Sequence, residues 1–379
     1  MRLLHDHALR IAGKSRFGLA ATPTPNIPKP EKLQARLDDA VGPVHSSREI
    51  SSMRRSQNLL VFVFSLLLLS CSFSQKPPQS QPVSTFSIVA RDSATGELGV
   101  AVASRFFAVG SVVPWAKAGI GAVATQSFAN TTFGWRGLEL LQKGATAEEA
   151  MKILLRGDSD RDRRQVGVVA SNGESITYTG KGCLAWAGGR NGPNYAIQGN
   201  ILAGEAVVTE MERAFLQTQG TLADRLYAAL IAGDANGGDA RGRQSAAMLV
   251  VKEDAGYGGY TDRAIDIRVD DNPDPFKELG RLLTYAQMNY AWNEGWTAFT
   301  KKQYGEALLH QERATSLAPQ NPEVLYDLAV IRLAAGKQVE ALDALKKALA
   351  LNPKLKKQAS VDNDLAGLKA NPEFQKLVE

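Results

Sequence analysis

The stretch that begins at Thr85 constrains the fold more than any other part of this chain. Three apolar runs of strand length, at residues 86–90, 98–103 and 120–125, follow one another closely. Turn-forming residues at Asp92–Gly96 join the first two runs, which predicts a β-hairpin. A hydroxyl residue thus opens an apolar strand of an antiparallel sheet. That position would suit a threonine that acts as a nucleophile.

Strand and helix patterns continue in mixed order to about residue 286. Two pairs of helices stand between groups of strands, which predicts an α+β domain with helices packed on two antiparallel sheets. Further strands are expected at residues 165–170, 175–179, 195–202, 246–252 and 264–269, and helices at 135–143, 146–155, 205–219 and 222–232. The pattern Thr146-Ala-Glu-Glu predicts a capped start for the second helix.

The C-terminal part of the chain repeats itself every 34 residues. Small residues that let paired helices approach closely recur, and a proline ends each unit. The matched positions are Ala307 with Ala341, Ala314 with Ala348, Pro319 with Pro353, and Gly295 with Ala329. This resembles the tetratricopeptide repeat and predicts an all-α module over residues 287–379, with a capping helix at Leu365–Leu377. The module either binds a peptide or protein partner, or only stabilises or dimerises the neighbouring domain.

A secretion signal is predicted inside the chain at residues 53–70. Met53 opens a basic segment, and the apolar run Leu59–Leu69 is too short to span a bilayer as a helix. The residues Leu68-Leu69-Ser70-Cys71 resemble a bacterial lipobox, which predicts a lipid anchor on Cys71 and a place in the bacterial cell envelope. Plain signal-peptidase cleavage, or a core segment, is the alternative. We expect translation to start at Met53, with residues 1–52 as a non-native or disordered extension and residues 71–84 as a polar tether.

The basic character of the chain does not indicate a nucleic-acid partner. The formal net charge is +5, and the residues up to Ser70 carry ten Lys and Arg against five Asp and Glu. The excess of positive charge therefore lies entirely in the predicted extension and signal, and the sequence from Cys71 onward is neutral overall.

Histidine is missing from the expected α+β domain. The four histidines are His5, His7, His45 and His310, which excludes Ser-His-Asp and Cys-His catalysis and a His-ligated zinc site within residues 85–286. Cys183 has no partner for a disulfide in the mature chain and is expected to be a small buried residue. We expect neither a metal nor another cofactor.

The polar segment Gly233–Arg243 is the main candidate for a binding site. It does not match a calcium loop, because Ser245 stands where a bidentate glutamate is needed, and no phosphate loop is present. One interpretation is a turn before the strand at 246–252. The other is the rim of a site formed by four crowded polar residues, Asp239, Arg241, Arg243 and Gln244.

Catalysis by an N-terminal threonine needs no histidine. Its α-amine has a pKa of about 8, so the amine can accept the hydroxyl proton while the oxygen attacks a carbonyl. A nearby Lys or Arg would keep the amine neutral, and backbone N–H groups or an Asn amide could stabilise the oxyanion.

Six sequence blocks closely resemble the domain-of-unknown-function 1028 family over about residues 85–286. The blocks are Thr85–Asp92, Gly99–Gly110, Val113–Ala116, Gly121–Gln126, Arg241–Ala247 and Asp266–Pro275. That family is placed in the N-terminal nucleophile hydrolase superfamily, which implies a four-layer αββα sandwich. Its activity is not established.

The resemblance also implies roles for individual residues. Thr85 falls at the nucleophile position of the superfamily, and Ser104 and Arg105 fall beside it at the end of the second strand. Lys117 precedes the third strand, where proteasome-like members place a lysine near the threonine, and Asn200 is a candidate oxyanion donor.

The tether departs from the family pattern, since fourteen residues, Cys71–Ser84, remain in front of Thr85 after lipobox cleavage. Either the Ser84–Thr85 bond breaks autocatalytically, or Thr85 is not a nucleophile. The sequence therefore supports two hypotheses. One is an envelope lipoprotein with an amidohydrolase or peptidase domain, and the other is a non-catalytic binding or scaffold lipoprotein.

Overall fold

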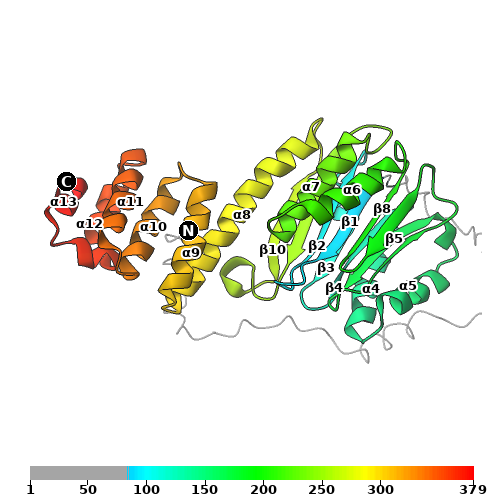
Figure 1. Cartoon of the computed structure of the whole chain (residues 1–379), viewed down its shortest axis with the longest axis horizontal. Coiled ribbons are helices and arrows are strands. Elements are labelled where there is room, and N and C mark those ends of the chain that lie inside the picture. The colour runs from blue at the N-terminus through cyan, green and yellow to red at the C-terminus, as the bar shows by residue number, and fades with distance from the viewer. Residues whose placement is uncertain (1–82, 84) are drawn as a thin grey trace, which may run out of the picture. The chain divides into compact units, whose positions relative to one another are not determined.

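Strands of alternating and continuous apolar residues build two antiparallel sheets. The computed structural model describes Val83 and residues 85–379 (Figure 1). The predicted extension, signal peptide, lipobox and the rest of the tether lie outside these residues. Within residues 85–379, no helix combines the length and the apolar character needed to cross a bilayer.

The larger sheet has six strands in the order β10-β9-β2-β1-β8-β7. Its strands are β1 (Thr85–Arg91), β2 (Leu98–Ser104), β7 (Gly188–Gly192), β8 (Tyr195–Asn200), β9 (Ser245–Val251) and β10 (Arg263–Val269). β1 lies in the interior of the sheet and pairs antiparallel with β2 on one side and β8 on the other. The β1–β2 hairpin confirms the prediction from the turn residues between them.

The smaller sheet has four strands in the order β3-β4-β5-β6. They are β3 (Pro114–Lys117), β4 (Gly121–Ser127), β5 (Arg164–Ala170) and β6 (Ser175–Thr179). The sequence patterns predict neither β3 nor β7. β3 is a four-residue edge strand that begins with a proline, and β7 is a glycine-rich edge strand, so neither carries a strong strand signal of its own.

The two sheets face each other, and helices cover their outer faces (Figure 1). α6 (Ala206–Gln217) and α7 (Leu222–Ala235) pack on the larger sheet, and α4 (Thr132–Gln142) and α5 (Ala147–Arg156) pack on the smaller one. Three apolar clusters fill the spaces between these layers. The predicted capping box at Thr146 is present, because its hydroxyl accepts from Glu149 N and the Glu149 carboxylate accepts from Thr146 N.

The C-terminal region is helical, as predicted. Its helices are α8 (Pro275–Thr300), α9 (Tyr304–Leu317), α10 (Pro322–Ala334), α11 (Gln338–Leu351), α12 (Leu355–Val361) and α13 (Pro372–Val378). One helix, α8, passes through position 286, where the sequence analysis divides the two modules. Its first half packs with the strands through Phe276 and Leu279, and its second half packs on α9.

The expected capping helix at Leu365–Leu377 is broken into two pieces. A 3₁₀ helix covers Asn363–Leu368, and α13 starts separately at Pro372. Proline cannot continue a helix in its interior but fits the first turn of a new one. Asn371 caps that new helix by accepting a hydrogen bond from Glu373 N at 2.8 Å.

Candidate functional site

Four polar residues form a row across the larger sheet. Asn200 of β8 lies opposite Thr85, Thr85 lies opposite Ser104 of β2, and Ser104 lies opposite Ser245 of β9. Residues directly opposite each other in antiparallel strands point to the same face. All four side chains are at most 2% exposed. We call Asn200, Thr85, Ser104 and Ser245 the Thr85 row.

A layer of buried glutamines joins the two sheets beside this row. Ser87 Oγ donates to Gln126 Oε1 of β4 at 2.6 Å, and Gln126 Nε2 donates to Gln165 Oε1 of β5 at 2.9 Å. Gln198 Nε2 of β8 donates to Ser87 Oγ at 2.6 Å. All of these side chains are fully buried. A hydrogen-bonded buried network of this kind fixes side-chain positions, because an unpaired polar group would cost about 1–3 kcal/mol.

The glutamine layer contacts the Thr85 row directly. Gln126 Nε2 lies 3.3 Å from the Thr85 carbonyl oxygen, and Asn200 Nδ2 donates to Gln165 Oε1 at 2.9 Å. The amide of Asn200 therefore points into the layer between the sheets. The sequence patterns do not single out these glutamines, although each interrupts or borders an apolar run at a buried, inward position. That interruption is the signal that could have found them.

The Thr85 hydroxyl points back along the chain. Its Oγ1 donates to the Val83 carbonyl oxygen at 2.8 Å and lies 3.4 Å from Ser104 Oγ. Val83 itself forms a two-bond antiparallel bridge with Ser127 at the end of β4. In the uncut chain, the hydroxyl of Thr85 is thus held at the carbonyl of Val83.

Three non-glycine residues with left-handed backbone lie at this edge of the sheets. Ser127 ends β4 with φ 64°, Ile201 follows β8 with φ 52°, and Ala108 follows β2 with φ 52°. Each such conformation costs on the order of 1–3 kcal/mol and persists only where the surroundings determine it, often at functional sites. Three of the six non-glycine residues with such a backbone in the described part of the chain thus lie at the end of the sheets where Thr85 lies.

The loop predicted as a rim packs against the end of β2. Asp239 is buried, and its carboxylate accepts from Arg105 N at 2.9 Å and pairs with the Arg241 guanidinium at 2.8 Å. The backbone of this loop also pairs with the chain just after Asn200, through an isolated antiparallel bridge between Asp239 and Leu202. The structure thus brings Asp239 and Arg241 close to Ser104.

A cavity of about 180 Å³ lies at this point and is lined by Ser104, Asp239 and Arg243 among others. Arg243 forms a two-bond ion pair with Asp234, with both distances 2.7 Å. Gln244, the fourth expected rim residue, faces elsewhere and donates to Asp271 Oδ1 at 3.1 Å. The lining includes Ser104 and Ser245 but not Thr85 or Asn200, so the cavity adjoins only the Ser104–Ser245 end of the Thr85 row.

The structure does not bring Lys117 to Thr85. β3 and β4 form a hairpin, so Lys117 lies opposite Gly121 at the turn, whereas Ser127 at the other end of β4 is near Thr85. Six residues of strand separate Gly121 from Ser127, about 20 Å. The Lys117 ammonium is exposed and donates to Gln142 Oε1 at 2.8 Å. The hairpin, which the sequence analysis missed, is the reason that this expectation was wrong.

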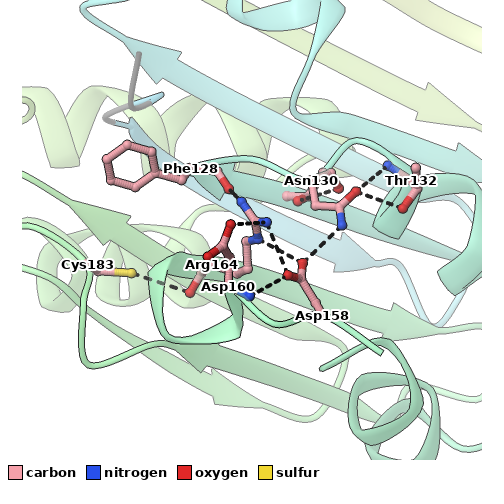
Figure 2. A network of polar contacts seen from close by, with 8 residues as sticks. Phe128, Asn130, Thr132, Asp158, Asp160, Arg164 and Cys183 are labelled. Carbon is pink, nitrogen blue, oxygen red and sulfur yellow. Dashed lines mark hydrogen bonds and ion pairs between the residues drawn. The ribbon is translucent and has the colours of Figure 1, made fainter. Parts of the chain in front are cut away.

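The turn after Ser127 is fixed by a buried ion pair (Figure 2). Arg164, which lies opposite Ser127 in the β4–β5 register, pairs with Asp158 at 2.8 Å and donates to the Phe128 carbonyl oxygen. Asn130 Nδ2 donates to the same Asp158 carboxylate at 3.0 Å. The side chains of Arg164 and Asp158 are only 14% and 7% exposed. The pair therefore holds the backbone that binds Val83.

Burial alone would raise the pKa of Asp158, but hydrogen bonds from Arg164 and Asn130 outweigh it and lower the pKa. The unfolded-state pKa is about 3.9. The pair thus contributes stability above about pH 4 that is lost as pH falls through the lower folded-state pKa.

We expect Asp158→Asn to flatten the fall in unfolding free energy between about pH 4 and 2, measured by urea unfolding. Asp160→Asn, at 59% exposed, is the control; equal slopes in both variants would contradict this.

Cys183 is half-buried and lies at the same network, where its Sγ is 3.3 Å from the Arg164 carbonyl oxygen (Figure 2). Burial raises the pKa of its thiol. A raised pKa disfavours the thiolate, which is the nucleophilic form. This environment agrees with a packing role.

Comparisons with known proteins match the part of the chain that carries the Thr85 row. The model of a family of unknown function, DUF1028, matches residues 85–279. The crystal structure of protein SPO2555 from Silicibacter pomeroyi, assigned to the same family, is similar at 32% sequence identity and a TM-score of 0.50. The match covers 54% of this chain and 86% of that protein. The curated proteins gave no match.

Proposed function

Because this chain belongs to DUF1028, a family of unknown function, we propose its function from the geometry at Thr85. We propose that it is an amide hydrolase of the N-terminal nucleophile type with Thr85 as the nucleophile. The observation that carries this proposal is the Thr85 row, in which a threonine begins an interior strand and is aligned with Asn200, Ser104 and Ser245. Residues 85–286 contain no histidine, so another base is needed.

The order of the layers supports the same assignment. Helices α4 and α5, the smaller sheet, the larger sheet, and helices α6 and α7 follow one another in contact. We infer that this is the four-layer αββα sandwich of N-terminal nucleophile hydrolases. In that arrangement, the space between the sheets at the start of β1 would hold the reacting groups.

Activation would begin with attack of Thr85 Oγ on the carbonyl carbon of Ser84. The bond between that carbon and the Thr85 nitrogen breaks, and the nitrogen takes up the proton that the hydroxyl loses. An ester between Ser84 and Thr85 results. Water then hydrolyses the ester, which leaves a carboxylate on Ser84 and both a free amine and a hydroxyl on Thr85. The 2.8 Å bond from the hydroxyl to the Val83 carbonyl supports this step, because it directs the oxygen back toward the residues that precede Thr85.

The mature enzyme would repeat the same chemistry on a substrate amide. The Thr85 amine takes the hydroxyl proton as Oγ attacks, and it returns the proton to the leaving amine. Water hydrolyses the acyl ester and regenerates the enzyme. Ser104, 3.4 Å from Thr85 Oγ1, would orient the nucleophile. Asn200, opposite Thr85, would contribute to oxyanion binding, whereas Arg105 offers only an exposed guanidinium at the rim.

A non-catalytic binding or scaffold role is the second candidate. The observation in its favour is that Thr85 is 0% exposed and does not line the neighbouring cavity. If the tether stays uncut, the cavity with Asp239 and Arg243 would be the binding site, and Thr85 would serve only as a strand residue.

We propose that the uncut chain is an envelope lipoprotein anchored through Cys71, so that cleavage before Thr85 would release the domain from its anchor. We also propose that the C-terminal helices form two tetratricopeptide-type repeats. The pairs α8–α9 and α10–α11 support the repeats, since the small residues Ala307, Ala314, Ala341 and Ala348 are fully buried in them. Such a module would recruit a peptide or protein partner or pair two copies of the chain.

Labelling with a β-lactone tests whether Thr85 is the nucleophile. A β-lactone ring opens when a hydroxyl attacks it, so the protein gains the full mass of the probe. We expect one label per chain, located on Thr85 by peptide mapping, because an activated hydroxyl reacts far faster than other serines and threonines. A label spread over many residues, or none on Thr85 in the cut protein, would contradict the proposal.

A further inference from the structure

Val83 occupies an edge position of the smaller sheet. β3 covers the edge of β4 only from Gly121 to Ala124. Beyond that point, Val83 takes the place of the missing strand: its N–H donates to the Ser127 carbonyl oxygen at 2.7 Å, and Ser127 N donates to the Val83 carbonyl oxygen at 3.0 Å. An extended segment thus adds to a sheet edge through paired backbone bonds, which is a general mode of peptide recognition.

The Val83 side chain enters an apolar space between the sheets. It is 4% exposed and belongs to the same buried cluster as Val109, Val113 and Ala124. Full burial of a valine side chain contributes about 1.5–3 kcal/mol, whereas a charged side chain would lose its hydration there. The space is therefore selective for small aliphatic groups.

The receiving edge is built by residues other than Val83. Ser127 has a left-handed backbone, and the next carbonyl, that of Phe128, accepts from the Arg164 guanidinium (Figure 2). The Arg163 guanidinium lies 3.5 Å from the centre of the Phe128 ring. Neither contact involves Val83, so both can persist when no strand is bound and a second segment can then pair with the edge.

Self-cleavage and substrate hydrolysis would pass through the same kind of ester. In both reactions, the acyl group attached to Thr85 Oγ carries the residues that precede the cleaved bond. These residues must then leave the site along the same path. We propose that the Ser127 edge and the apolar space beneath Val83 form a substrate subsite. It binds a peptide in extended form, with a small aliphatic residue second before the cleaved bond. This inference rests on the proposed function and narrows its substrate class to peptides.

The subsite can be tested first in the full chain. Val83→Lys should slow cleavage of the Ser84–Thr85 bond by about 100-fold, since a buried ammonium is costly, whereas Val83→Ile should cleave at close to the normal rate. Intact mass against time gives both rates, and the thermal unfolding midpoint shows whether each variant folds. Equal rates for Val83→Lys and the unchanged chain would overturn the subsite.

The cut protein gives the second test, with peptides that differ in one residue. A peptide with valine second before the cleaved bond should have a kcat/KM about 100-fold above its lysine counterpart. Replacing the N–H of that valine by an ester oxygen should lower kcat/KM by about tenfold, because the bond to Ser127 is lost. Hydrolysis of the valine and lysine peptides at equal rates, or of small amides but no peptide, would overturn the subsite and leave the hydrolase proposal standing. A cut protein that hydrolyses no amide at all would overturn both.

Discussion

Replacement of Thr85 by alanine is expected to abolish both self-cleavage and amide hydrolysis. The change removes the attacking oxygen, and loss of a catalytic nucleophile lowers kcat by roughly 10⁴-fold or more. The fold should persist, because the hydroxyl makes only a 2.8 Å bond to the Val83 carbonyl and a 3.4 Å contact with Ser104 Oγ, and each hydrogen bond contributes about 1 kcal/mol. Intact mass reports cleavage, and kcat/KM on an amide library reports hydrolysis.

Two variants separate chemistry from packing in this experiment. Thr85→Ser keeps a hydroxyl and should retain cleavage. Thr125→Ala removes another fully buried hydroxyl, whose Oγ1 donates to the Asn130 carbonyl oxygen at 3.1 Å, and should leave the chemistry unchanged. If Thr85→Ala hydrolyses amides as fast as the unchanged protein, Thr85 is not the nucleophile.

Replacement of Arg164 by methionine is expected to lower the unfolding free energy by about 3–5 kcal/mol. Methionine keeps an apolar stem but leaves the Asp158 carboxylate, only 7% exposed, without its cation. The Ser127 edge would also lose the contact from Arg164 to the Phe128 carbonyl. We therefore expect slower self-cleavage as well as lower stability, the latter measured by urea unfolding at pH 7.

An exposed pair provides the matched control. Lys143 and Glu139 are 70% and 50% exposed, so Lys143→Met should cost less than about 1 kcal/mol. Adding Asp158→Asn to Arg164→Met should recover part of the loss, because the unpaired charge is removed. A loss below about 1 kcal/mol for Arg164→Met would show that the buried pair does not hold the turn.

The sequence predicted the strands that carry their own apolar pattern. β1, β2, β4 and β5 are largely apolar runs of strand length, and the turn Asp92–Gly96 marks the first hairpin. β3 and β7 depend instead on backbone pairing with β4 and β8. Such pairing is a property of the neighbouring strand, so local residues do not reveal it. For the same reason, apolar spacing does not show that α8 changes its packing partner along its length.

The family resemblance, rather than any local pattern, pointed to Thr85, Ser104 and Asn200 of the Thr85 row. The resemblance placed Ser104 beside Thr85, and the β1–β2 hairpin does bring the two residues opposite each other. Ser245 comes from a strand far along the chain, and its place beside β2 is a matter of sheet order. The glutamine layer joins strands of different sheets, which no local pattern specifies. Lys117 was expected near Thr85 from the likeness to proteasome-like members, but the β3–β4 hairpin places it opposite Gly121, at the other end of β4 from Ser127.

The most direct test of the central claim is the N-terminal residue of the protein isolated from its native cells. Intact mass and terminal peptide sequencing identify it without any assumed substrate. Our account predicts a chain that begins at Thr85 with a free amine, together with a separate fragment that ends at Ser84. A chain in which the Ser84–Thr85 bond is uncut in all molecules would contradict the account, and the α+β domain would then be a binding module.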